Sequence, residues 1–250
     1  MTLEKHLRED RVNDNLTLMQ YTDGLTFGTD ALLLAAYINR GAKSRALELG
    51  GGTGIVSLLL ATRKKVRHVE CVEIQPAFAA LAQRNVTLNA LDGSVKVTEA
   101  DIRRLGDYGE GEFDIVLTNP PYMKNEGAAC QSEEKQIARH EVCGTVDDFV
   151  LAAAKKLKWG GRFFCVWRPD RMEELFAALS KNGIAPKRMT FVHATPDLPP
   201  SILLLEGKRG GKPGLRVTPP LLIGGDLSAR ADSPHMCYIL EKGAFPAIYE

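Results

Sequence analysis

Alternation between two kinds of apolar run is the feature that most limits what this chain can fold into. From Arg45 onward, short runs rich in Val, Ile, Leu and Phe are followed by longer runs with helical spacing of the apolar residues. Such alternation favours a mostly parallel sheet that is covered by helices on both faces. We expect strands over residues 45–50, 68–74, 94–100, 113–119, 162–167, 187–194 and 201–208, and helices over 55–65, 76–89, 147–158 and 171–183.

The segment before Arg45 has a different pattern. Strands over 16–20 and 25–27 are expected to form a hairpin, because the Asp-Gly pair between them suits a tight turn. A helix is expected over 31–40, with Thr29 and Asp30 as its N-cap signal and an arginine at its end.

The chain has 250 residues, enough to bury a substantial core as one domain. We expect a single domain over 1–250, made of an N-terminal hairpin and helix (1–44), a core (45–207) and a C-terminal basic loop and tail (208–250). The tail is rich in Gly and Pro, and no secondary structure is predicted for it.

Composition limits the class of protein. The net charge of +1 excludes a histone-like polycation but not a nucleic-acid enzyme, because binding depends on where the charges lie. The five cysteines include no C-x-x-C pair, so we expect no disulfide framework and no metal site. The charged N-terminus lacks the apolar core of a signal peptide, and no apolar run is long enough to span a membrane. The prediction is a cytoplasmic protein.

A glycine-rich loop follows the first core strand, with Glu48, Gly50, Gly52 and Gly54 in an E-x-G-x-G-x-G arrangement. Glycines allow sharp turns and close approach of a ligand to the backbone, and such loops lie where open α/β sheets bind nucleotides. The dinucleotide fingerprint would need glycine where Ile55 stands, and the G-K-[ST] of a phosphate-binding loop is absent. The pattern therefore favours an adenosyl ligand without a pyrophosphate, of which S-adenosylmethionine is the common one.

Acidic residues follow the next two strands. Glu73 can accept hydrogen bonds from both ribose hydroxyls, as acidic residues do in Rossmann-like folds. Asp101 can accept from the adenine amine, with the Ile102 N–H available for a ring nitrogen. Glu48 is expected beneath the loop, where it either orients the loop or meets the ammonium of the cofactor.

The fourth core strand runs into Asn119-Pro120-Pro121-Tyr122. An exocyclic aromatic amine is a weak nucleophile, because its lone pair is delocalised into the ring. The side-chain oxygen of Asn119 and the carbonyl of Pro120 can accept its two N–H groups, which frees the lone pair and stabilises the developing positive charge. Tyr122 can stack on a base. The segment predicts transfer of a methyl group to an amine, with Asn119 lying beside both cofactor and substrate.

These motifs resemble the class I methyltransferases with an NPPY motif, and within them the family that methylates N6 of adenosine 37 in tRNA-Val. The similar segments are FGTDALLLAAY (27–37), LELGGGTG (47–54), VEIQP (72–76), DIVLTNPPYMK (114–124), IARHE (137–141), GGRFFCVWRPDR (160–171) and EGKRGGKPGLRV (206–217). The resemblance implies a seven-stranded sheet with a reversed last strand, contacts of S-adenosylmethionine near Thr29, and a tRNA substrate. The loop 124–135 varies in the family and does not test the choice of RNA.

A basic run supplies candidate contacts to the RNA, namely Lys208, Arg209, Lys212 and Arg216. A run of charge is more often a solvated surface, but the resemblance favours phosphate contacts here. The residues expected to extend this face are Lys155, Lys156, Lys158, Lys187 and Arg188.

Two alternatives stay open. The same chemistry could act on an rRNA base, a DNA adenine or a protein glutamine, although no separate helical domain or target-recognition domain is evident in the sequence. The chain could also be an RNA-binding protein of the same fold that has lost catalysis, against which the presence of Glu73, Asp101 and Asn119 argues.

Overall fold

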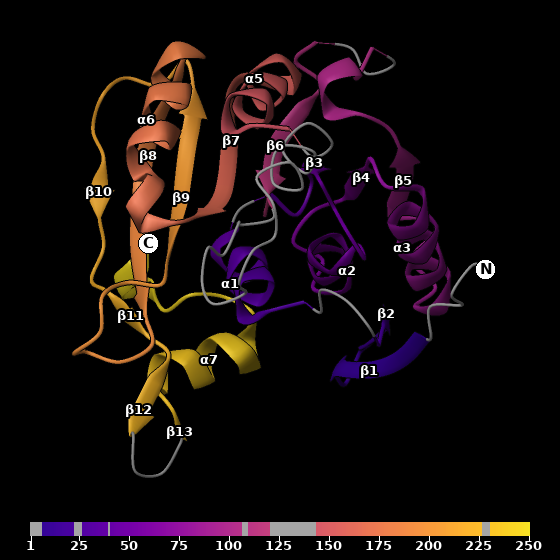
Figure 1. Ribbon diagram of the computed structural model, residues 1–250, viewed down its shortest axis with the longest axis horizontal. Helices are drawn as coiled ribbons and strands as arrows, with labels where there is room; N and C mark the ends of the chain where they lie inside the picture. Colours follow the sequence, from indigo (N-terminus) through magenta and orange to yellow (C-terminus); the bar gives the residue numbers. More distant parts are fainter. Residues whose placement is uncertain (1–6, 23–26, 40, 107–109, 121–143, 227–230) are drawn as a thin grey trace, which may run out of the picture.

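The computed structural model describes residues 7–22, 27–39, 41–106, 110–120, 144–226 and 231–250. Its centre is a nine-stranded sheet in the order β10-β8-β9-β7-β6-β3-β4-β5, with β11 also pairing with β8 (Figure 1). The strands are β3 (Arg45–Leu49), β4 (His68–Glu73), β5 (Val95–Glu99), β6 (Phe113–Thr118), β7 (Leu157–Trp167), β8 (Ile184–His193), β9 (Ile202–Arg209), β10 (Arg216–Val217) and β11 (Leu221–Leu222).

The sheet confirms the predicted fold class. All of its paired strands run parallel except β9, which is antiparallel to both β7 and β8. The seven longer strands form the expected sheet with a reversed last strand, and β10 and β11 add two short parallel strands along β8. Because of the reversal, the carboxyl end of β9 lies at the edge of the sheet where its neighbours begin.

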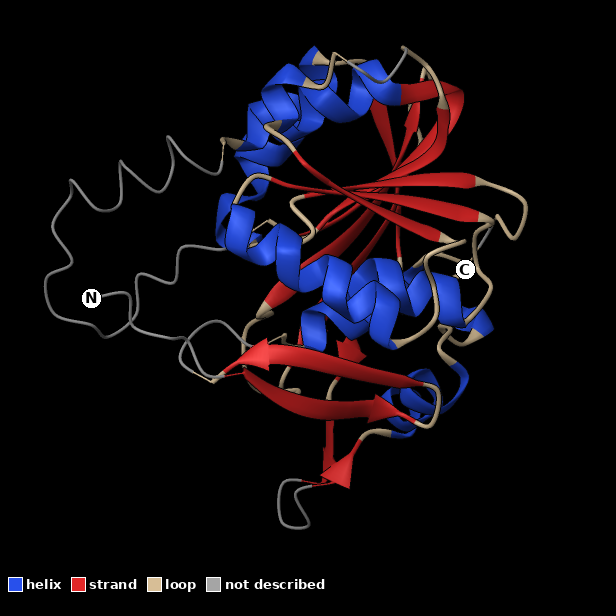
Figure 2. Ribbon diagram, turned by 90° about the vertical axis from the view of Figure 1, so that its right-hand side faces the viewer, coloured by secondary structure: helices blue, strands red, loops and turns tan. Residues whose placement is uncertain are grey.

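Helices cover both faces of the sheet, as Figure 2 shows. One apolar core lies between the sheet and α1, α2, α3 and α7, and the second lies between the other face and α5 and α6. The helices are α1 (Thr29–Tyr37), α2 (Ile55–Thr62), α3 (Pro76–Leu88), α5 (Val146–Lys156), α6 (Met172–Lys181) and α7 (Pro234–Lys242). Their order along the chain agrees with the predicted alternation, although β7 begins five residues earlier than expected because α5 ends at Lys156.

The structure describes an N-terminal hairpin that precedes the predicted one along the chain. Strand β1 (Leu7–Asn13) pairs with β2 (Leu16–Tyr21) around a turn at 14–15, where the Asn13 side chain accepts a hydrogen bond from the Asn15 N–H. A short polar side chain that bonds its own backbone two residues on is an effective turn former. The expected Asp-Gly turn lies outside the described residues, and Phe27 belongs to no strand.

Asn85 of α3 and the C-cap residue of this helix, Asn89, attach the hairpin to the core. Asn85 and Asn89 stand one helical turn apart, and each uses its amide as donor and acceptor toward the backbone of β2, at Met19 and Thr17. Asn85 also donates to the Thr53 carbonyl at 3.0 Å. The hairpin is therefore tied through α3 to the loop after β3.

Helix α1 begins at Thr29, and its N-cap residue is Gly28, so the predicted N-cap role of Thr29 and Asp30 was wrong. The Asp30 carboxylate instead accepts from the next backbone N–H, of Ala31. At the other end of the helix, Lys65 donates to the carbonyls of residues 35, 36 and 38. Arg40, the expected end of the helix, lies outside the described residues.

The C-terminal tail is folded, contrary to the expectation that it has no secondary structure. Besides β10 and β11 it contains α7 and the short pair β12 (Gly224–Asp226) and β13 (Ala231–Asp232). The buried Arg188 guanidinium donates to the carbonyls of Tyr37 and Tyr249 and pairs with Glu206 at 3.0 Å. The tail is thereby joined to α1, β8 and β9, so packing against these elements overrides its Gly and Pro content.

Candidate active site at the carboxyl ends of the strands

The glycine loop follows β3 in a backbone conformation that side chains rarely adopt. Gly50, Gly52 and Gly54 have φ values of 74°, 55° and 82°. The N–H groups of Gly50 and Gly51 both donate to the Val72 carbonyl, which holds the loop against β4. A Cβ atom placed on Gly52 would meet no atom within 4 Å, so a ligand has room to approach the backbone there. This space fits the predicted adenosyl cofactor.

Glu73, the last residue of β4, lies directly beside this loop. Its carboxylate accepts from the Gly52 N–H at 2.8 Å and from the Gln75 N–H at 2.9 Å. An ionised carboxylate offers about four acceptor positions, so two remain for the predicted ribose hydroxyls. The side chain is buried and oriented by these two backbone donors before any ligand binds.

Glu48 lies beneath the loop with 1% of its surface exposed. It accepts hydrogen bonds from both the N–H and the hydroxyl of Ser57, in the first turn of α2. Burial raises the pKa of Glu48 to about 7, and the nearby Glu73 raises this pKa further, against the lowering effect of Ser57. Of the two predicted roles, these contacts favour the orientation of the loop and of α2.

Asp101 follows β5 and is the N-cap of the short 3₁₀ turn η1 (Ile102–Arg104). The Arg103 guanidinium pairs with it at 2.7 Å, and hydrogen bonds from Arg103 lower the pKa of Asp101. Asp101 therefore lies at the predicted strand end, but it is held by a neighbouring cation that sequence reasoning missed. The Ile102 side chain is buried in the core on the α5 and α6 face.

Asn119 follows β6, the strand that pairs with β3, so it lies beside the glycine loop. The Thr118 hydroxyl donates to the Leu49 carbonyl at 2.9 Å and joins the ends of these two strands. The Asn119 Nδ2 donates to Asp30 Oδ2 at 3.2 Å. Because a carboxylate only accepts, Asp30 determines which end of the amide faces it and leaves the amide oxygen on the other side.

Sequence reasoning missed this role of Asp30, having treated it as part of a helix cap. Thr29, predicted as a cofactor contact, is exposed immediately beside it. Pro120 is buried next to Asn119. Tyr122, the predicted stacking residue, lies outside the described residues.

The predicted RNA contacts do not lie near Asn119. Lys208 pairs in register with Arg162, and Arg209 with Ile184, so both lie where β7 and β8 begin, at the opposite edge of the sheet. Lys212 follows them, and Arg216 lies in β10 at the side of the sheet. The reversed direction of β9 causes this displacement.

Three of the expected phosphate contacts have internal partners instead. The Arg209 guanidinium donates to the Leu157 carbonyl, and the buried Lys156 ammonium donates to the Leu105 carbonyl. Arg188 is buried in the contacts of the C-terminal tail. Among the described residues there is no cluster of potential metal ligands and no helix long and apolar enough to cross a membrane.

Known methyltransferases are similar to this chain. The family model of the methyltransferase small domain matches residues 22–182. The chain belongs to this methyltransferase family. It is 35% identical over 179 residues to a tRNA1(Val) (adenine(37)-N6)-methyltransferase of Haemophilus influenzae, covering 67% of this chain and 76% of the relative. The methyltransferase of the same name from Phocaeicola vulgatus is 30% identical, covering 72% of this chain and 76% of the relative.

Two solved methyltransferase structures have a similar fold. A predicted O-methyltransferase from Agrobacterium tumefaciens superposes with a TM-score of 0.70 at 23% identity, covering 87% of this chain and 98% of the other. M. jannaschii TYW2, solved with AdoMet, superposes with a TM-score of 0.56 at 14% identity, covering 83% and 88%. These identities support the fold alone.

Proposed function

We propose that this methyltransferase transfers the methyl group of S-adenosylmethionine to N6 of adenosine 37 in tRNA1(Val). The observation that carries the proposal is the position of Asn119 beside the glycine loop, with its amide nitrogen bound to Asp30. The curated relatives that have this activity in their names support the choice of RNA and atom. A tRNA substrate also supports the predicted cytoplasmic location.

The residues of this chain hold and orient the two reactants. S-adenosylmethionine supplies an electrophilic methyl group on a sulfonium centre. The backbone at Gly52 leaves room for it, and Glu73 would accept from its ribose hydroxyls. Asp101 accepts from its adenine amine once the ligand competes with Arg103 for the carboxylate.

Asn119 acts on the target amine of the RNA. Its Oδ1 accepts one N–H of the adenine N6 group, and the Pro120 carbonyl accepts the other. These contacts localise the nitrogen lone pair and stabilise the positive charge that forms as the N–C bond is made and the S–C bond breaks. The methylated nitrogen then loses one proton to solvent. The fixed orientation of the amide by Asp30 means that the acceptor need not reorient during transfer.

The test is mass spectrometry of nucleosides from unmodified tRNA-Val incubated with S-adenosylmethionine and protein. The wild type is expected to produce N6-methyladenosine at position 37. Asn119→Ala is expected to reduce transfer by about a thousandfold or more, while binding the cofactor within about threefold of wild type by calorimetry. Retained cofactor binding is the folding control.

Three results would contradict the proposal. Methylation of an rRNA, a DNA adenine or a release-factor glutamine in place of tRNA would keep the chemistry and change the substrate. Absence of cofactor binding at millimolar concentration would favour a non-catalytic RNA-binding protein. Full activity of Asn119→Ala would show that the amide has no part in transfer.

A further inference from the structure

An open groove of about 510 Å³ lies at the edge of the sheet where the parallel strands begin, opposite the candidate active site. Arg45 and His68 are the first residues of β3 and β4, and Lys158 lies near the start of β7. The lining is Lys43, Arg45, Arg67, His68, Gly93, Asp114 and Lys158. Because β6 has six residues, the two edges are separated by about 20 Å.

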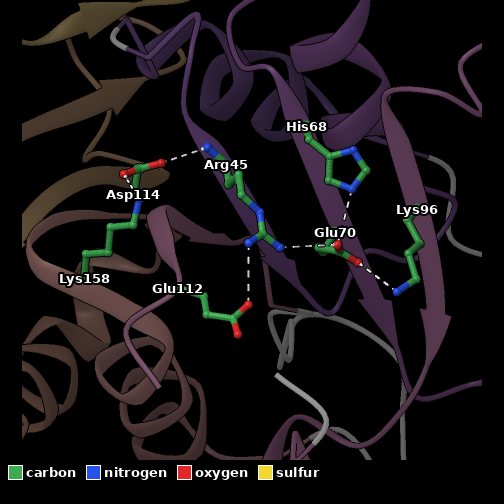
Figure 3. Close-up of polar contacts among 7 residues, drawn as sticks. All are labelled: Arg45, His68, Glu70, Lys96, Glu112, Asp114 and Lys158. Atoms are coloured by element: carbon green, nitrogen blue, oxygen red, sulfur yellow. Dashed lines mark hydrogen bonds and ion pairs between the residues drawn. The ribbon is translucent and has the colours of Figure 1, made fainter. Parts of the chain in front are cut away.

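Carboxylates hold some of the groove cations in place. Figure 3 shows Glu70 between Arg45, His68 and Lys96, with the Arg45 guanidinium also near Glu112. In the same view the Lys158 ammonium contacts the Asp114 carboxylate at 2.6 Å, and Asp114 also accepts from the backbone N–H of Arg45.

Positive charge exceeds negative charge around the groove. The lining and its ion-pair partners contain five lysines and arginines, at positions 43, 45, 67, 96 and 158, against the carboxylates at 70, 112 and 114, an excess of two. Lys43 and Arg67 are exposed, and within the described part of the chain neither forms an ion pair. These two cations are therefore available to an anion.

A highly exposed aromatic residue follows the groove residue Lys158 in the chain. Trp159 follows Lys158 in β7 and has 80% of its surface exposed. Its indole ring lies against Gly210, where a Cβ atom would overlap it, so the glycines of the basic run provide its support. Lys187 and Lys208 lie against the adjacent Gly211. An exposed indole with lysines beside the glycines that support it suits an unstacked base next to its phosphates.

We propose that the groove and Trp159 form a second RNA-binding surface, in which Lys43 and Arg67 contact phosphates and the indole stacks on an unpaired base. The inference rests on the proposed function, since the RNA is the one that is methylated at the opposite edge. It gives the basic run a role that its distance from Asn119 otherwise leaves unexplained: the run supports Trp159 and supplies its flanking lysines. A substrate held at both edges is positioned along the length of the sheet.

The first experiment uses the intrinsic fluorescence of the protein. The chain has two tryptophans, and Trp167 is buried, with its indole N–H bonded to the Arg171 carbonyl. Titration with an unmodified tRNA-Val transcript is expected to quench the emission of the wild type and of Trp167→Phe. The quenching is expected to be lost in Trp159→Phe. Equal quenching in Trp159→Phe would overturn the proposal.

The second experiment measures affinity for the same transcript as a function of salt. Lys43→Glu combined with Arg67→Glu is expected to weaken binding about tenfold near physiological salt and to reduce the log–log salt slope by about 1.5. Arg84→Glu combined with Lys242→Glu changes the net charge equally at exposed sites on α3 and α7 and is expected to stay within about twofold of wild type. Cofactor affinity serves as the folding control for both.

Failure of this inference differs from failure of the proposed function. RNA binding through Trp159 without methylation of any RNA would refute the proposed function and keep the surface. If the protein methylates tRNA, but neither Trp159→Phe nor the Lys43→Glu and Arg67→Glu pair changes its binding of tRNA, only the proposed surface is refuted. Light scattering that shows a dimer, converted to monomer by Trp159→Phe, would assign the surface to protein contact and overturn the inference.

Discussion

Acidic residues at the two edges of the sheet have different partners. At the carboxyl edge, Glu48 and Glu73 are buried and accept hydrogen bonds from a serine and from backbone N–H groups. At the opposite edge, Glu70 and Asp114 lie among arginine and lysine side chains. Neutral donors orient a carboxylate while leaving acceptor positions for ligand hydroxyls and amines, whereas cations neutralise it.

The same contrast appears in the pKa values. Burial raises the pKa of Glu48 to about 7. Partial burial would also raise the pKa of Asp114, but hydrogen bonds from Lys158 and the Arg45 backbone outweigh it and lower that pKa. The comparison teaches that a buried carboxylate with neutral partners, such as Glu48 or Glu73, keeps unfilled acceptor positions or a raised pKa, whereas a carboxylate paired with cations does not. Asp101, paired with Arg103, is an exception at the carboxyl edge.

The largest effect is expected at the contact between Asp30 and Asn119. Asp30→Ala frees the amide to rotate and should lower kcat about 100-fold, or about 2.7 kcal/mol of activation free energy, with little change in KM for the cofactor. Asp30→Asn retains an acceptor oxygen and should recover part of the rate. Asp92→Ala, which removes an exposed carboxylate just before β5 at the other edge, is the matched control. A normal kcat for Asp30→Ala would show that the amide is oriented by other contacts.

The next effect concerns pH. The Glu48 carboxyl has a pKa of about 7 in the folded protein against an ordinary 4.5, so its proton stabilises the fold fully below pH 4.5, and this contribution is lost as the pH rises through 7. Between pH 5 and pH 8, denaturant unfolding should show wild type losing about 2.5 kcal/mol relative to Glu48→Gln. The Asp114 contribution has the opposite sign, being present at neutral pH and lost on acidification. Parallel pH curves for wild type and Glu48→Gln would contradict the contrast between the edges.

The smallest effect compares packing at two glycines. A Cβ on Gly51 would overlap the Cys71 sulfur, so Gly51→Ala should cost about 2 kcal/mol of unfolding free energy, and adding Cys71→Ala should restore part of it. Gly93 lines the groove at the opposite edge, where a Cβ meets nothing within 4 Å, and Gly93→Ala should change stability by less than about 0.5 kcal/mol. Equal costs in thermal or denaturant unfolding would refute the tighter packing at the carboxyl edge.

Much of the site could be predicted because parallel strands bring their ends together. The alternation of strands and helices predicts that each of four polar residues follows or ends a strand on one edge, and the structure places all four there: Glu48, Glu73, Asp101 and Asn119. The role of each toward cofactor or substrate stays a prediction. Asp30 was missed because its partner is 89 residues away, and a Thr-Asp pair before a helix is ordinarily a local cap.

Other features depend on contacts that local patterns do not contain. The basic run was predicted as a phosphate-contacting face without a position on the sheet, because its place at the edge opposite Asn119 follows from the antiparallel pairing of β9 with β7 and β8. The glycines and prolines of the tail predict no regular structure, but contacts with the buried Arg188 and Tyr37 order it. The turn between β1 and β2 was not predicted, because it depends on a hydrogen bond from the Asn15 N–H to the Asn13 side chain.

The pairing of Asn85 and Asn89 with β2 has a consequence for solubility. An open strand edge is a template for another chain, and proteins commonly block such edges with charge, proline or a covering element. Here β1 occupies one edge of β2, and two side-chain amides occupy backbone positions on the other, as a neighbouring strand would. Replacing both asparagines with leucine would leave helix α3 intact yet expose that edge, and intermolecular β-sheet assembly would become accessible to a chain whose fold is otherwise unchanged.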